Sequence, residues 1–420
     1  MTPAVSRLFG TVFTSPALRD ARRALNRRPG PPVIDYFHQT DDPYSHLAVQ
    51  TLPSLAARYG ARIRPWLVPP PADSAAPERA RLRAYGLRDA AVLAAEYGLA
   101  FPAAAVLPDA SAAAAATAAL ASTTEPAAFA ARGVAVGEAL WSGGPPPEGH
   151  PDPTTRLAEG AAERRRLGHY LGAMFHFEGE WCWGVDRLHH LEARLRARGF
   201  DTAPAGTPAI AGWRDVRLDG ASRPGRRPVI EFWFSFRSPY TWIAFPRVRR
   251  LAAHYGADLR LRYILPMVMR GLPVPRIKSL YIMLDTKREA DRLGLPFGRM
   301  VDPAGAGAER ALAVAHLATP LGLGEDFSER ALRGAFAEGV DLASDKGLYD
   351  VAVAAGLTAA QVDAALADEG WREEAEINRT ALLDAGLWGA PTCRVDGGPA
   401  HWGQDRLWAL EADVKRALTG

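Results

Sequence analysis

The 420-residue sequence predicts an α/β protein made of two similar halves, and stretches of self-similarity support this prediction. The segment PVIDYFHQTDDPYSHLA, which begins at Pro32, matches PVIEFWFSFRSPYTWIA from Pro228 at a constant offset of 196 residues (228 − 32). The segments LAARYGARIR from Leu55 and LAAHYGADLR from Leu251 keep the same offset. Near the ends of the two halves, FEGEWCWGVDRLHHLEARL parallels VDGGPAHWGQDRLWALEADV. We therefore interpret the chain as a tandem duplication.

The composition is typical of a globular protein with two domains. Hydrophobic residues make up 48% of the chain and charged residues 23%, and the length favours two domains over one. The 50 Lys and Arg residues exceed the 47 Asp and Glu residues by only three, so we expect no nucleic-acid partner. The two cysteines, Cys182 and Cys393, form no C-x-x-C pair, which argues against a dithiol redox centre and fits a reducing cytoplasm.

The elements follow one order in both halves. Residues 1–30 are Arg-rich without the apolar core of a secretory signal, so we expect a basic amphipathic lead-in helix there. Each half then shows an apolar strand, a helix, a second strand, a long helical insert, a hairpin and a closing helix. The first strands are at 33–38 and 229–234, and the second strands are at 62–68 and 258–265. This order predicts a thioredoxin-like fold with an inserted helical subdomain in each half.

The expected domains are residues 31–200 and 228–420. A stretch rich in Pro, Gly and Arg, residues 201–227, separates them and is predicted to be a linker. The insert of the first half contains ASAAAAATAALAS, which favours helix because alanine has the best helix propensity. No stretch has eighteen or more uninterrupted apolar residues, so we expect no membrane span.

Four motifs of the second half carry a family resemblance. They are SPYTW at 238–242, KSLYIMLDTKREADRLGLPF at 278–297, INRTALLDAGLWGAPT at 377–392 and HWGQDRL at 401–407. In this order they resemble the 2-hydroxychromene-2-carboxylate isomerases and the kappa-class glutathione transferases, which are DsbA-like enzymes of the thioredoxin fold. The resemblance covers nearly all of residues 228–420.

The resemblance implies that Ser238 is catalytic and binds the thiolate of glutathione, the implied cofactor. Physical chemistry supports this role, because a hydroxyl donor at a helix N-terminus adds to a site that already favours anions and lowers the pKa of a thiol. A plain N-cap also explains the Ser-Pro pair, since serine is a preferred cap and proline a preferred first helical residue. The neighbouring aromatic residues Phe234, Phe236, Tyr240 and Trp242 would suit a ring-shaped substrate, although core packing is their commoner use.

The GAPT segment supplies the second part of the implied site. Thioredoxin-like sites keep a cis-proline opposite the active helix, and the resemblance places Ala390 and Pro391 there, where the backbone can pair with a peptide ligand. We therefore predict a cis bond between Ala390 and Pro391. The alternative is a trans proline at the first residue of a strand.

Four further residues are implied in ligand binding. The resemblance suggests that Gln404 and Asp405 receive the γ-glutamyl end of glutathione, although Asp405 could equally be a dipole partner at a helix start. Lys278 and Asn378 match positions near glutathione or substrate in the family. A lone lysine on an insert helix is more commonly a solvated charge.

The first half departs from this pattern. The offset of 196 places Asp42 where Ser238 stands, and a carboxylate would repel a thiolate. The residues Gly172-Ala173-Met174 align with Gly-Ala-Pro, so Met174 replaces the proline and a trans Ala173-Met174 bond is expected. With the same alignment Ala161 replaces Asn378. We expect a degenerate first copy without a glutathione site.

The first half also contains a Cys/His-rich region without an expected metal site. The segment WCWGVDRLHH joins His38, His46 and His176 in this half, but no metal-ligand spacing is visible. Scattered His and Trp residues are more commonly packing residues.

The leading functional interpretation is a cytoplasmic, glutathione-dependent isomerase or transferase that acts on a small hydrophobic, aromatic electrophile. One alternative is a DsbA-like thiol-disulfide oxidoreductase, which the missing C-x-x-C disfavours. Another is a non-catalytic binding protein with the thioredoxin fold. The expected partner is a small aromatic substrate, with neither nucleic acid nor membrane, and the chain is expected to be a monomer with an internal pseudo-dimer or a homodimer.

Overall fold

The computed structural model describes residues 2–147, 152–223 and 225–419, which divide into two compact units. The C-terminal unit consists of residues up to Arg19 and from Arg214 onward, and the N-terminal unit of residues 20–213. The division falls inside the segment expected to be a linker. The lead-in is two helices rather than the one expected, α1 (Pro3–Phe13) and α2 (Pro16–Leu25). Pro16 starts α2, because proline fits the first turn of a helix but disfavours helix in the residue before it.

The C-terminal unit contains a four-stranded mixed sheet with the order β6-β5-β7-β8. Strand β5 (Val229–Phe234) pairs in parallel with β6 (Asp258–Tyr263) and antiparallel with β7 (Thr392–Val395), and β7 pairs with β8 (His401–Trp402). The helix α10 (Pro239–Tyr255) connects β5 to β6, and η4 (Gln404–Arg406) and α17 (Leu407–Thr419) close the unit.

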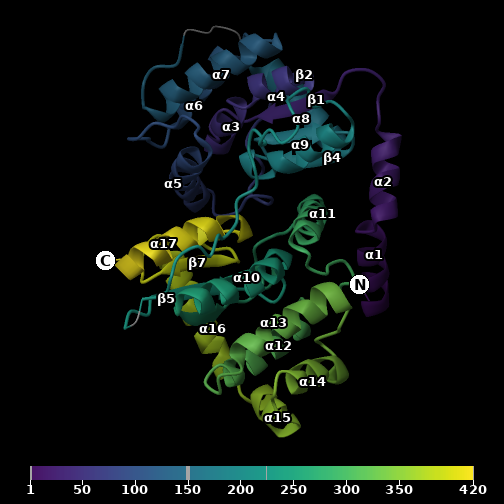
Figure 1. The fold of residues 1–420 in the computed structure, drawn as a ribbon, viewed down its shortest axis with the longest axis vertical. Coiled ribbons are helices and arrows are strands. Elements are labelled where there is room, and N and C mark those ends of the chain that lie inside the picture. The colour runs from purple at the N-terminus through teal and green to yellow at the C-terminus, as the bar shows by residue number, and fades with distance from the viewer. Residues whose placement is uncertain (1, 148–151, 224, 420) are drawn as a thin grey trace. The chain divides into compact units, whose positions relative to one another are not determined.

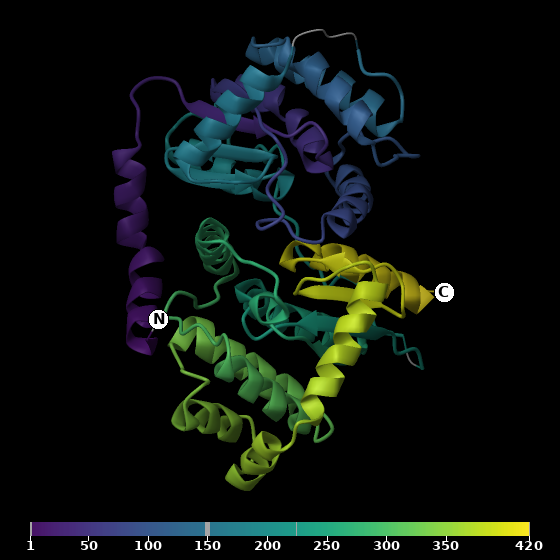
Figure 2. The same cartoon turned by 180° about the vertical axis from the view of Figure 1, so that it is seen from behind.

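A helical insert separates β6 from β7, with α12 to α15 grouped together in Figure 1. Its elements are η2 (Met267–Arg270), α11 (Arg276–Leu293), α12 (Ala306–Ala318), α13 (Gly324–Arg333), η3 (Gly334–Glu338), α14 (Asp345–Ala354), α15 (Ala359–Ala367) and α16 (Gly370–Asp384). Figure 2 shows α16 running from the insert back to the sheet. The insert thus returns the chain to β7, next to the strand from which α10 starts.

The N-terminal unit has a sheet of the same strand order, β2-β1-β3-β4. Its strands are β1 (Val33–His38), β2 (Arg62–Leu67), β3 (Met174–Phe177) and β4 (Glu180–Trp183). Its helices are α3 (Pro43–Val49), α4 (Leu52–Tyr59), α5 (Arg79–Tyr97), α6 (Ala110–Ala121), α7 (Pro126–Trp141), α8 (Thr154–Leu167), η1 (Val185–Arg187) and α9 (Leu188–Ala197). The predicted α/β class, with mixed sheets and helical inserts, is confirmed. The duplication itself stays a prediction, which the equal strand order supports.

The first helix differs between the units. In the C-terminal unit α10 is one helix, whereas in the N-terminal unit the corresponding segment is broken into α3 and α4. Pro53 lies in the first turn of α4, where a proline is best tolerated because the N–H that it lacks would have no partner within the helix.

The sheet register corrects the sequence alignment by one residue. Phe37 of β1 pairs with Met174, whereas Trp233 of β5, which is 196 residues later, pairs with Thr392. Met174 therefore corresponds to Thr392, and the offset in this part of the chain is 218 (392 − 174). Ala173, not Met174, lies at the position of Pro391.

A backbone hydrogen bond independently supports this corrected alignment. The N–H of Gly184 donates to the carbonyl of Ala173 at 2.7 Å, and the N–H of Gly403 donates to the carbonyl of Pro391 at 2.9 Å. The alignment by residue identity failed because it matched the two Gly-Ala pairs, whereas the pairing of a strand is set by its hydrogen-bond ladder. The same offset of 218 places Gly160, not Ala161, opposite Asn378.

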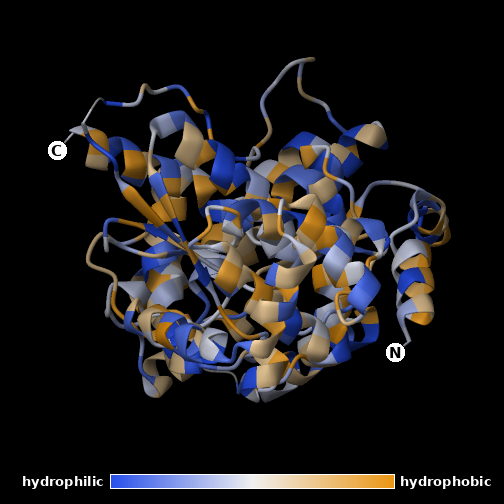
Figure 3. Cartoon of the chain, turned by 90° about the horizontal axis from the view of Figure 1, so that it is seen from below, coloured by the Kyte–Doolittle hydropathy of each residue, from blue (hydrophilic) through white to orange (hydrophobic). Residues whose placement is uncertain are grey.

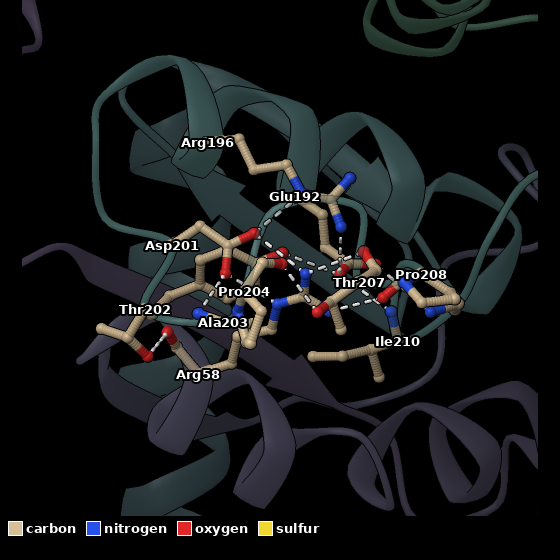
Figure 4. Close-up of polar contacts among 12 residues, drawn as sticks. Arg58, Glu192, Arg196, Asp201, Thr202, Ala203, Pro204, Thr207, Pro208 and Ile210 are labelled. Atoms are coloured by element: carbon tan, nitrogen blue, oxygen red, sulfur yellow. Dashed lines mark hydrogen bonds and ion pairs between the residues drawn. The ribbon is translucent and has the colours of Figure 1, made fainter.

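Two buried glutamates, Glu192 and Glu411, accept hydrogen bonds from backbone N–H groups of the segment expected to be a linker. In the N-terminal unit Glu192 accepts the Tyr59 hydroxyl at 2.8 Å and the N–H groups of Ile210 and Ala211. Figure 4 shows the polar contacts of this segment, in which Asp201 binds the guanidinium of Arg58 through both of its oxygens. The start of the linker is therefore an ordered part of this unit.

The C-terminal unit uses the same arrangement. Glu411 accepts the Tyr255 hydroxyl at 2.7 Å and the N–H groups of Arg217 and Leu218 at 2.6 and 2.7 Å. Burial alone would raise the pKa of Glu411, but these three donors and nearby Lys415 outweigh it and lower the pKa. The end of the linker is thus anchored to α17.

The helix α1 packs on the C-terminal unit although it precedes the N-terminal unit in sequence. Ser6, Gly10 and Thr14, spaced four residues apart, form its buried face. The Arg7 Nε donates to the carbonyl of Gly339 at 2.7 Å. The opposite face of α1 carries exposed apolar residues, and residues of this type are coloured orange on the helix at the N label of Figure 3. They are Val5, Leu8, Phe9 and Val12.

An aromatic core anchors the turn between β5 and α10. Phe234 contacts Phe245 of α10 with ring centroids 5.4 Å apart, and Phe236 contacts Phe327 of α13 at 6.2 Å. Phe234, Phe236 and Trp242 are buried, so these aromatic residues serve the core rather than a substrate pocket. Among the described residues no helix has the length and apolarity needed to cross a membrane.

Candidate functional site

Ser238 lies at the junction of β5 and α10 and caps the helix. Its extended backbone (φ −95°, ψ 111°) lets the Oγ accept the N–H of Thr241 at 3.2 Å, as expected for a serine before Pro239. The same hydroxyl donates to the carbonyl oxygen of Ala390 at 3.1 Å. Ser238 is therefore an N-cap, and its one proton is directed at the Ala390-Pro391 peptide.

The structure brings Ser238 and the proline segment together. The Ala390-Pro391 bond is cis, as predicted, and it is the one cis bond in the parts of the chain that the structure describes. The Ala173-Met174 bond is not among the cis bonds, so that prediction is confirmed as well. The carbonyl of Pro391 accepts the N–H of Gly403, which connects the proline segment to the start of η4. Ser238, Ala390 and Pro391 thus form one continuous site at the N-terminus of α10.

Gln404 lies beside this site, but both ends of its amide are already bonded. Its Oε1 accepts Nη1 of Arg247 at 2.6 Å, and its Nε2 donates to Glu289 Oε2 at 3.0 Å. The Nε2 also donates to the carboxylate of Asp405. We find Gln404 buried behind Asp405, which is partly exposed, so direct ligand contact by the Gln404 amide would require breaking these bonds.

Asn378 and Lys278 are placed differently from each other. The fully buried Asn378 side chain accepts Nη1 of Arg262 at 3.0 Å and donates to the carbonyl of Tyr263 at 3.2 Å. The backbone carbonyl of Asn378 accepts the indole N–H of Trp233 at 2.8 Å. In this structure Asn378 therefore connects α16 to β5 and β6 from a fully buried position. Lys278 lies in the first turn of α11 and is partly exposed, and burial lowers its pKa.

Comparison with known families identifies the part of the chain that carries this site. Residues 229–415 match the family model of the DSBA-like thioredoxin domain. We refer to this matching part of the C-terminal unit as the DsbA-like domain. The 2-hydroxychromene-2-carboxylate isomerase of Pseudomonas putida is 26% identical over 198 residues, which are 45% of this chain and 95% of that protein. The predicted resemblance to DsbA-like proteins is thereby confirmed for this half.

Solved structures match over a similar length. The structure of a 2-hydroxychromene-2-carboxylate isomerase is 23% identical, with a TM-score of 0.38, and covers 45% of this chain and 95% of its own. The cytosolic disulfide reductase DsbM from Pseudomonas aeruginosa with GSH is 19% identical, with a TM-score of 0.36, and covers 46% of this chain and 100% of its own.

A tyrosine–aspartate pair that the sequence analysis missed supports the start of α10 in the DsbA-like domain. The Tyr240 hydroxyl donates to Oδ2 of buried Asp285 at 2.7 Å, and Arg288 donates to its Oδ1 at 2.8 Å. In the N-terminal unit Tyr44 donates to Asp89 in the same way at 2.8 Å. The offset of 196 also relates these aspartates (285 − 89), so extending the self-comparison into the inserts would have found the pair.

Thr241 of the DsbA-like domain has a fully buried hydroxyl with no hydrogen-bond partner among the described residues. Its counterpart in the N-terminal unit, Ser45, accepts the N–H of Ala173 at 2.9 Å and donates to Asp42 at 2.8 Å. Pro391 takes the place of Ala173 and has no N–H, so the donor that satisfies Ser45 is missing at Thr241.

We predict that Thr241→Val leaves the free energy of unfolding unchanged or raises it by about 1 kcal/mol, because an unsatisfied buried hydroxyl is costly. The reference variant Ser45→Ala should lower it by about 1 to 3 kcal/mol, because it leaves buried groups without their partner. Urea unfolding of both variants measures this difference. A Thr241→Val protein less stable than Ser45→Ala would show that the threonine hydroxyl has an important partner.

The position of Ser238 is occupied by Asp42 in the N-terminal unit. Asp42 caps α3, accepting the N–H groups of Tyr44 and Ser45 at 3.3 and 3.2 Å as well as the Ser45 hydroxyl. Burial raises the pKa of the Asp42 carboxyl to about 7, against the lowering effect of these hydrogen bonds. A partly ionised carboxyl therefore stands where the DsbA-like domain presents a hydroxyl.

Both cysteine thiols are buried, and so are His38 and His46 of the N-terminal unit. Cys182 and Cys393 form no disulfide among the described residues and are both buried, and burial raises the pKa of the Cys393 thiol far above its usual value. Cys393 is thus a small core residue rather than a nucleophile. Burial lowers the pKa of His38 to about 3 and that of His46 to about 4, so both are neutral at physiological pH.

Proposed function

We propose that the DsbA-like domain is a glutathione-dependent isomerase or transferase that acts on a small aromatic electrophile. The observation that carries the proposal is the hydroxyl of Ser238, which stands at the N-terminus of a 17-residue helix and directs its proton at the cis-proline segment. No cysteine is at this position, so a sulfur atom held here must come from a ligand. The 26% identity to an isomerase of 2-hydroxychromene-2-carboxylate adds support for the reaction class.

The residues of the site fit a peptide thiol. Glutathione would supply a thiolate that adds to an activated carbon of the substrate and leaves again in an isomerisation, or stays attached in a transfer. Ser238 would turn its hydroxyl from the Ala390 carbonyl to the sulfur, and the N-terminus of α10 would stabilise the negative charge. Asp405 would accept the ammonium group of the γ-glutamyl end. Lys278, on the first turn of α11, would stabilise negative charge on the substrate.

Two features of the structure weigh against the oxidoreductase alternative. Disulfide exchange needs an accessible thiolate, whereas Cys182 and Cys393 are both buried. The position of the reactive cysteine in redox relatives holds Ser238 here and Asp42 in the N-terminal unit. The N-terminal unit is accordingly proposed to bind no glutathione.

Calorimetric titration with glutathione tests the proposal. We expect one binding site per chain, weakened in Ser238→Ala and unchanged in Asp42→Asn. Binding should be accompanied by turnover of an aromatic electrophile, measured by its absorbance. Absence of binding, or two equivalent sites per chain, would contradict the proposal.

A further inference from the structure

The buried guanidinium of Arg247 contacts Gln404, which lies beside the candidate ligand site. Arg247 is on α10, and it is 6% exposed. Its Nη1 donates to the side-chain oxygen of Gln404 at 2.6 Å and to the Gln404 carbonyl at 3.1 Å. On its other side Nε donates to Asp215 at 3.1 Å, and Nη2 donates to the same carboxylate. Arg247 therefore fixes both the backbone and the side chain of Gln404.

This contact determines which way the Gln404 amide points. A guanidinium can only donate hydrogen bonds, so the amide oxygen must face Arg247. The NH₂ group must then face the carboxylates of Glu289 and Asp405, to which it donates. The flipped amide would place donor against donor on one side and oxygen against two carboxylates on the other. Arg247 thus fixes the orientation of the Gln404 amide, and this amide in turn donates to the carboxylate of Asp405.

The N-terminal unit has the aspartate without this support. The segments GVDRL at 184–188 and GQDRL at 403–407 occupy corresponding places, so Asp186 corresponds to Asp405. The side chain of Val185 in the first segment cannot donate a hydrogen bond to this aspartate. The offset of 196 places Thr51 where the DsbA-like domain has Arg247. The complete Arg-Gln-Asp arrangement is therefore particular to the unit that carries Ser238.

We propose that Arg247 is a positioning residue, which orients Asp405 through Gln404 and thereby makes the site selective for a ligand with a free ammonium group. The proposal rests on the proposed function, in which this ligand is glutathione and the ammonium belongs to its γ-glutamyl end. Arg247 does not contact the residues proposed to bind the sulfur. It should therefore control recognition of the ammonium end without changing the pKa of the bound thiol.

The experiment compares glutathione with an analogue in which a glutaryl group replaces the γ-glutamyl group, so that only the ammonium is missing. Calorimetry gives the dissociation constant of each peptide, and the thiolate absorbance gives the pKa of the bound thiol. In the wild type we expect a preference for glutathione of about tenfold or more, the effect of one charge-assisted hydrogen bond. Asp405→Asn should remove this preference.

In Arg247→Met we expect the preference to fall to about twofold or less, with unchanged affinity for the analogue and unchanged thiol pKa, because only the ammonium contact weakens. Arg250→Met, which removes an exposed arginine of the same helix, is the matched control and should behave as the wild type. Gln404→Val copies the N-terminal unit and should lose the preference as Arg247→Met does. It provides the test if Arg247→Met does not fold.

The outcomes separate this inference from the function on which it rests. A wild type that binds neither peptide contradicts the proposed function. A wild type that prefers glutathione, with the same preference in Arg247→Met and Gln404→Val, contradicts the role of Arg247 alone. Equal weakening of both peptides in these variants would likewise overturn it, because it would show general damage to the site.

Discussion

Replacing Ser238 by alanine is expected to raise the pKa of a glutathione thiol bound at the start of α10 and to slow the reaction by one to two orders of magnitude. The variant loses the charge-assisted hydrogen bond to the thiolate, a contribution of about 1.5 to 3 kcal/mol. It also loses the cap of α10, which should lower stability by about 0.5 to 2 kcal/mol. Titration of the thiolate absorbance of bound glutathione, together with the rate of turnover, measures the first effect.

A second cap in the same domain provides the control for this prediction. Ser344 caps α14 by accepting the N–H of Gly347 at 3.1 Å. Ser344→Ala should lose stability as Ser238→Ala does, but the thiol pKa and the rate should stay as in the wild type. If Ser238→Ala kept the wild-type thiol pKa and full activity well below its unfolding temperature, Ser238 would be a cap and nothing more.

Introducing leucine at Gly10 is expected to destabilise the C-terminal unit by about 1 to 3 kcal/mol or to detach α1 from it. A Cβ atom at Gly10 would lie 2.7 Å from Cγ of Met300 and still closer to the carbonyl oxygen of Gly298. The second of these is a backbone atom that cannot rotate away. The small residue is therefore required for the close approach of α1 to this loop.

The matched control for Gly10→Leu is Thr11→Leu, which places the same side chain on the exposed face of α1. Urea unfolding should show a lower midpoint for Gly10→Leu only. Hydrogen exchange should become faster in α1 and in the segment around Met300. Equal stability of the two variants would mean that α1 contributes little to the unit.

Local signals made the centre of the candidate site predictable. Ser238 and Pro239 have the typical residue types of a helix start, and the proline of GAPT lies at a strand start, so both could be placed from the sequence. The order of strands and helices followed from the apolar runs and their period. These features depend on residues close to each other in the chain.

The contacts that depend on distant residues could not be predicted in this way. Gln404 and Asn378 are polar residues in a family motif, and only the structure shows that Arg247 and Arg262 already bind their side chains. The one-residue shift around Ala173 arose because residue identity does not reveal a hydrogen-bond ladder. The packing of α1 against residues more than 280 positions away could not be predicted either, because its buried face consists of the small residues Ser6, Gly10 and Thr14 whereas its apolar residues are exposed.

The position of α1 also affects the order in which the C-terminal unit can be completed during synthesis. Residue 339, whose carbonyl binds Arg7, is made 332 residues after it (339 − 7). At roughly 5 to 20 residues per second this delay is about 15 to 65 s. An 11-residue helix is only marginally stable alone, so α1 must wait without a partner while the continuous N-terminal unit folds. A helix that is made before the whole N-terminal unit is therefore among the last parts of the C-terminal unit to dock.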